Sequence, residues 1–126
     1  MTAPRQEAFG AFAPAYSATN PTNTGTLVTS MTIAATVASG TGTLPNIPSV
    51  GYSDQTQIQI ANTGTTWAYV NFGLTAATVP AATVAASYPV GPGAVVVVTV
   101  NPEVTGVACI LASGTGNVTF TRGAGI

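Results

Sequence analysis

The chain has 126 residues and is almost uncharged, with two arginines, three Asp or Glu residues, no His and a net charge of −1. Only 4% of its residues are charged, against about 25% in ordinary soluble domains, so little self-repulsion keeps copies apart. Two arginines cannot neutralise a series of phosphates or follow an anionic lipid surface, so we expect neither nucleic acid nor a membrane as partner.

Side chains that carry out chemistry are equally scarce. Acid–base catalysis would fall to Glu7, Asp54 and Glu103, which stand among turn or arm residues, and no Ser or Thr can be activated by a histidine. We therefore predict a non-enzymatic protein with no catalytic residue, no cofactor and no metal site. The single Cys109 lies in an apolar run and is interpreted as a small buried hydrophobe.

The first part of the chain differs in composition from the rest. We predict an extended N-terminal arm over residues 1–25 and a β-domain over 26–126. Within the arm we interpret Phe9, Phe12 and Tyr16 as apolar anchors at a protein interface, because aromatic side chains on an arm gain most by burial against a partner. The alternative is that they belong to a first strand in the chain's own core.

Thr, Val and Ala dominate the next segment, and β-branched residues favour strands. The run Leu27–Ala38 predicts one long strand. The Ser-Gly-Thr-Gly segment at 39–42 predicts the turn that ends it, and the prolines that follow predict a loop.

Regular alternation begins at Gln55, and Ile58 and Ile60 then fall on one face of a half-buried strand. The returning strand is predicted at 67–72, and the 62–65 turn would make the pair a hairpin with Gly64 at positive φ. Trp67 and Tyr69 then lie on the face opposite Ala68, Val70 and Phe72. We interpret Trp67 and Tyr69 as interface residues, with core packing under the arm as the alternative.

Strand signals recur to the end of the chain. A short strand is predicted near Thr83–Ala86, followed by strands over Ala94–Val100, Gly106–Ala112 and Asn117–Arg122. Short strands at this spacing predict an all-β fold, either an antiparallel β-sandwich or a jelly-roll-like barrel.

Four consecutive valines, Val95–Val98, show no alternation. Such a run predicts a strand covered on both faces, by the core on one side and by the arm or a neighbouring subunit on the other. The chain also has few large apolar residues with which to build a core. We therefore expect a homo-oligomer.

Several segments resemble small proteins encoded near the capsid genes of tailed phages. They are Gln57–Gly64, Ala68–Gly73, Gly91–Gly93 and Ala108–Gly116. The resemblance is to head decoration or cement proteins, and it implies a trimeric β-sandwich or jelly-roll domain that binds the major capsid protein on the virion surface through its arm. A tail-fibre or receptor- and glycan-binding module of a virion is the alternative function.

Overall fold

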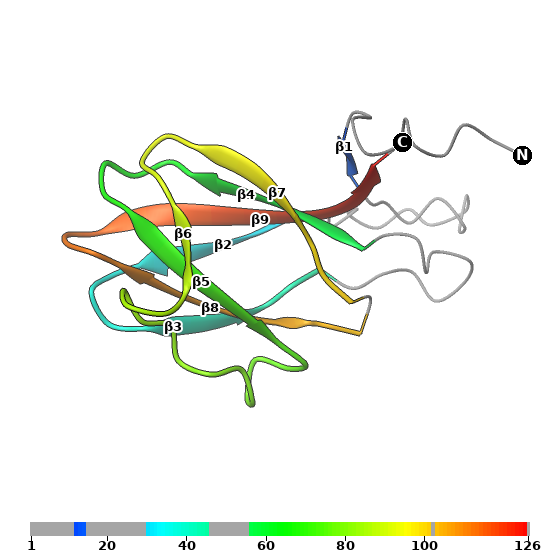
Figure 1. Cartoon of the computed structure of the whole chain (residues 1–126), viewed down its shortest axis with the longest axis horizontal. Helices are drawn as coiled ribbons and strands as arrows, with labels where there is room; N and C mark the ends of the chain where they lie inside the picture. Colours follow the sequence, from blue (N-terminus) through cyan, green and yellow to red (C-terminus); the bar gives the residue numbers. More distant parts are fainter. Residues whose placement is uncertain (1–11, 15–29, 46–55, 102, 126) are drawn as a thin grey trace, which may run out of the picture.

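The computed structural model describes residues 12–14, 30–45, 56–101 and 103–125, which form two antiparallel sheets packed as a β-sandwich (Figure 1). The predicted fold class is confirmed. The nine strands of the described residues are β1 Phe12–Pro14, β2 Ser30–Ala35, β3 Gly40–Thr43, β4 Gln57–Asn62, β5 Ala68–Gly73, β6 Tyr88–Val90, β7 Val95–Thr99, β8 Gly106–Leu111 and β9 Gly116–Gly125.

The first sheet is built around β9, which pairs with β1 and β2 on one side and with β4 on the other, and β7 follows β4. The second sheet has the order β3-β8-β5-β6. From β3 onward each strand lies in the sheet opposite its predecessor, except that β6 follows β5 in the same sheet. This order is that of a jelly roll.

The core lies between the two sheets and is made by the inward residues of alternating strands. Ile58 and Ile60 of β4 are fully buried, as their alternation predicts, and so is Phe120 of β9. Phe72 packs edge-on against Phe120, with ring centroids 6.4 Å apart. Cys109 is buried as predicted, and burial raises the pKa of its thiol to about 11.

The predicted hairpin at 57–72 is wrong, because β4 and β5 belong to opposite sheets. The turn between them is held by the buried side chain of Asn62. Its Nδ2 donates to the Thr66 carbonyl at 2.9 Å and to the Val90 carbonyl at 3.0 Å, while its Oδ1 accepts from the Gly64 N–H at 3.0 Å. Among the described residues positive φ occurs at Gly93 and Gly114, so Gly64 does not have the predicted conformation.

The predicted strand over 27–38 is shorter, because β2 begins at Ser30 and ends at Ala35. The segment predicted as its closing turn instead contains strand β3. Gly40 and Gly42 pair with Cys109 and Val107 in that strand, and a Cβ at Gly42 would overlap the Met31 side chain. Glycine there serves close packing at the edge of the sandwich rather than a turn.

The strand predicted near Thr83–Ala86 is also absent, since these described residues form a turn and the strand begins at Tyr88. Ser87 stabilises the turn with two hydrogen bonds to Thr83. Its N–H donates to the Thr83 carbonyl at 3.1 Å, and its Oγ accepts from the Thr83 N–H at 2.9 Å. A local side-chain to backbone bond of this kind competes with strand pairing.

Part of the predicted arm is described. Phe12–Pro14 forms β1 and pairs with the end of β9, Phe12 opposite Gly125 and Pro14 opposite Gly123. The other arm residues, Phe9 and Tyr16 among them, lie outside the described residues.

Candidate interaction surface

On the outer face of the first sheet the described side chains carry no charge. Because the side chains of a strand alternate between faces, Ser30, Thr121, Gln59 and Val97 form one row across four strands. Thr32, Thr119, Ala61 and Val95 form the next row. We call these eight residues the open face, because each is exposed or half-buried.

Hydroxyl pairs order one side of the open face. The oxygens of Ser30 and Thr121 lie 2.7 Å apart, and those of Thr32 and Thr119 lie 2.9 Å apart. Each pair shares one hydrogen bond between neighbouring strands, a recurrent cross-strand contact in sheets. These side chains therefore keep unused hydrogen-bonding capacity that can face a partner.

The outer face of the second sheet is covered by the chain itself, through residues 74–87. Val79 and Ala82 are buried there against Ala108 of β8. Asn71 of β5 donates from Nδ2 to the carbonyls of Pro80 at 3.2 Å and Ala81 at 3.0 Å. The two outer faces thus differ within the described residues, since residues 74–87 cover the second sheet and no described segment covers the first.

Glycine allows the 74–87 segment to approach the second sheet closely. A Cβ at Gly106 of β8 would overlap the backbone of Thr75, and one at Gly73 would lie 2.8 Å from the Val79 Cα. Contacts that short do not occur for real Cβ atoms. The cover therefore depends on the absence of side chains at these two positions.

The described part of the chain contains two charged residues, Glu103 and Arg122. Glu103 is exposed, whereas Arg122 is fully buried next to the core. The Arg122 Nε donates to the Pro45 carbonyl at 2.8 Å and its Nη2 donates to the Val104 carbonyl. Burial lowers the pKa of the guanidinium from its usual value. Arg122 thus ties the ends of three segments together and leaves the described surface nearly neutral.

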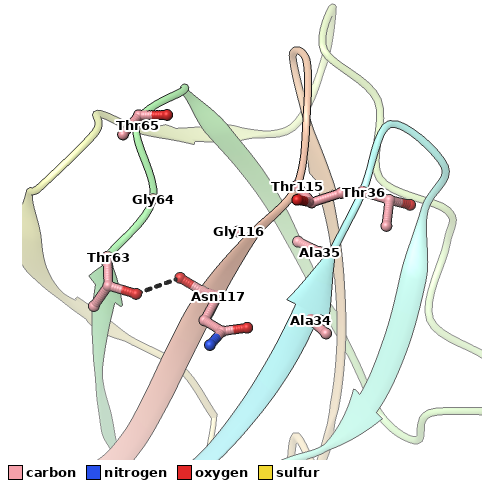
Figure 2. A pocket seen from close by; sticks show the side chains of 9 residues that line it. All are labelled: Ala34, Ala35, Thr36, Thr63, Gly64, Thr65, Thr115, Gly116 and Asn117. Atoms are coloured by element: carbon pink, nitrogen blue, oxygen red, sulfur yellow. Dashed lines mark hydrogen bonds between the residues drawn. The ribbon is translucent and has the colours of Figure 1, made fainter.

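An open depression of about 490 Å³ adjoins the open face where β2, β9 and the β4–β5 turn meet (Figure 2). Its lining combines small side chains with the polar groups of Thr36, Thr63, Thr115 and Asn117. Thr63 closes one wall, because its Oγ1 donates to the Asn117 carbonyl at 3.0 Å and its N–H donates to the same oxygen at 3.1 Å. The lining has hydroxyl and amide groups but no charge.

Two predicted interface residues point away from the core, Tyr69 within β5 and Trp67 directly before it. Trp67 is exposed and Tyr69 is half-buried, whereas Ala68 and Val70 are buried. The predicted division of faces is confirmed. The Trp67 ring lies beside Gly91, because a Cβ at that glycine would be 3.5 Å from the indole Cη2. Trp67 and Tyr69 belong to the second sheet and do not join the open face.

Sequence reasoning missed the open face and the buried Arg122, although a signal existed for both. Thr119 and Thr121 alternate with Val118 and Phe120, which places the two threonines outward. The same alternation places Arg122 inward, on the face of Val118 and Phe120.

Within the part of the chain that the structure describes, no cluster of three or more His, Cys, Asp or Glu side chains could hold a metal ion. The described ranges also contain no helix of a length and hydropathy that would cross a membrane. Comparison with known proteins finds no matching family, curated protein or solved structure.

Proposed function

We propose that this chain is a virion structural protein, a decoration or cement protein that binds the major capsid protein at the capsid surface and stabilises the particle. The observation that carries the proposal is the contrast between the two sheets. One sheet is covered by residues 74–87, while the other presents the uncharged open face. A neutral sheet face with spare hydroxyl groups suits attachment to another protein surface.

The class of partner comes from the resemblance of segments such as Gln57–Gly64 and Ala68–Gly73 to phage decoration proteins. That resemblance also implies a homotrimer as the attached form. The jelly-roll order is compatible with this role, since viral capsid domains share it, but lectin domains share it as well. The arm, with Phe9, Phe12 and Tyr16 as anchors, is the second proposed attachment element.

The test uses capsids that lack the protein, to which purified protein is added back. We expect wild-type protein to raise the resistance of the particles to heat and to chelators. Thr32→Lys places a charge on the open face and is expected to abolish the gain, because a charge buried without a partner is costly. Val84→Lys, at an exposed position of the 74–87 segment, is the matched control and is expected to retain the gain.

Two results would count against the proposal. Unchanged capsid resistance with wild-type protein would exclude cementing. Equal protection by Thr32→Lys and wild-type protein, with both folded by circular dichroism, would exclude the open face as the attachment surface.

A second candidate function is a receptor- or glycan-binding module of a virion, and the depression beside the open face favours it. Its lining of Thr36, Thr63, Thr115 and Asn117 offers donors and acceptors that match sugar hydroxyls without any charge. Binding of the protein to a glycan array, lost in Asn117→Ala and accompanied by no affinity for capsids, would favour this candidate over the first.

A further inference from the structure

Strand β7 is the last described strand on one side of the first sheet. Within the described residues it pairs with β4 alone. The Val100 N–H donates to the Thr56 carbonyl and the Asn62 N–H to the Ala94 carbonyl, so even-numbered residues direct their backbone groups toward β4. In an antiparallel strand the alternate residues direct theirs the other way. The N–H and C=O groups of Val95, Val97 and Thr99 therefore point out from the sheet edge.

The side chains along this edge are apolar and exposed. Val95 is 59% exposed and Val97 is 43% exposed. Val96 and Val98 pack against the core and are half-buried. Proteins usually protect such edges with proline, lysine or a bulge. The β6 edge carries Pro89, whereas β7 has neither a proline nor a charge.

We propose that β7 pairs with the β7 strand of a second copy of this chain, antiparallel and across a two-fold axis. Centred on Val97, the pairing sets Val97 opposite its own counterpart and Val95 opposite Thr99. All outward backbone groups then find partners, in about six new hydrogen bonds. The proposal concerns the free protein and does not depend on attachment to a capsid.

A second copy fits this edge because the strand is self-complementary. A two-fold contact requires that one patch match itself, and four valines followed by a threonine bring no like charges together. A net charge of −1 adds almost no repulsion between two chains. The pairing would also join two open faces into one continuous surface, because edge contact leaves both sheet faces uncovered.

Sedimentation equilibrium of the free protein over a range of concentrations tests the proposal. We expect a monomer–dimer equilibrium that Val97→Pro weakens about 30-fold, since proline removes the two bonds donated by the symmetry-related Val97 N–H groups. The same N–H is not used in pairing with β4, so an edge proline leaves the sheet intact. Val97→Thr keeps the N–H and the branched shape, and is expected to associate like wild type.

A charge pair gives a second test that does not require a proline in the strand. Val97→Lys and Val97→Glu should each associate several-fold more weakly alone, and a mixture of the two should regain association as a heterodimer. A wild-type protein that stays monomeric at high concentration would overturn the proposal. Association by another stoichiometry or surface, unchanged in Val97→Pro and in both charged variants, would overturn it as well.

Discussion

A Cβ added at Gly106 tests whether the second sheet depends on its cover. The glycine lies in β8 beneath the 74–87 segment, and an alanine Cβ would overlap the Thr75 carbonyl group and lie 2.7 Å from the Ala76 nitrogen. Its φ is not positive, so alanine fits the local backbone. Gly106→Ala therefore probes the contact with the segment and not strain in the strand.

The expected cost follows from two contributions. Overpacking by one methyl costs roughly 1–3 kcal/mol. Lifting the segment also weakens the two bonds that Thr105 donates to the Leu74 carbonyl, from its N–H at 3.0 Å and its Oγ1 at 2.6 Å, each worth about 1 kcal/mol. We expect Gly106→Ala to lower the free energy of unfolding by about 3 kcal/mol, which corresponds to about 10 °C in Tm.

Two other strand glycines provide matched controls. At Gly40 the nearest atom to an added Cβ is the Ile33 Cγ2 at 3.8 Å, so Gly40→Ala should change stability by less than about 1 kcal/mol. At Gly42 the overlap is with the flexible end of Met31, and the cost should be intermediate. Urea unfolding of the three variants measures the series. Equal stability of Gly106→Ala and Gly40→Ala would refute the close approach of the cover.

Three further outcomes are expected. Phe120→Ala should lower the free energy of unfolding by about 4 kcal/mol, because a fully buried ring and its contact with Phe72 are lost; a loss below about 1 kcal/mol in calorimetry would contradict the core position. Between pH 9.0 and about 11 the Cys109 thiol stays protonated in the folded chain but ionises in the unfolded chain. The free energy of unfolding should therefore fall as pH rises through that range, and should fall less in Cys109→Ala. Deletion of residues 1–20 should leave the circular dichroism of the sandwich unchanged, since β9 keeps β2 and β4, and should abolish binding to capsids; retained binding would show that the arm is not needed.

Strands with clear alternation could be predicted from the sequence, and their sheet partners could not. Ile58 and Ile60 marked β4 because period-two burial is a local property. The connection from β4 to β5 was predicted as a hairpin turn, whereas it crosses between the two sheets. Turns within a sheet and crossings between sheets have similar sequences. The difference lies in Asn62, whose amide bonds to Val90, 28 residues away, and a contact of that range leaves no local pattern.

For the candidate surface, too, local alternation could be predicted from the sequence and the pairing of distant strands could not. The outward direction of Trp67 and Tyr69 follows from alternation beside Ala68 and Val70. The open face, in contrast, requires the register of four strands that are distant in sequence, such as Thr32 opposite Thr119. The cover over the second sheet was likewise unpredicted, because Val79 and Ala82 lie in a segment without regular alternation.

In the proposed function the open face, and not the covered one, meets the partner in the assembled particle. Hydroxyl-radical footprinting of free and capsid-bound protein measures this directly. Three residues of the open face, Thr32, Thr119 and Val95, should lose reactivity on binding. Val84 and Leu74 on the opposite layer should keep theirs. Protection of Val84 and Leu74 with undiminished reactivity at Val95 and the two threonines would contradict the account.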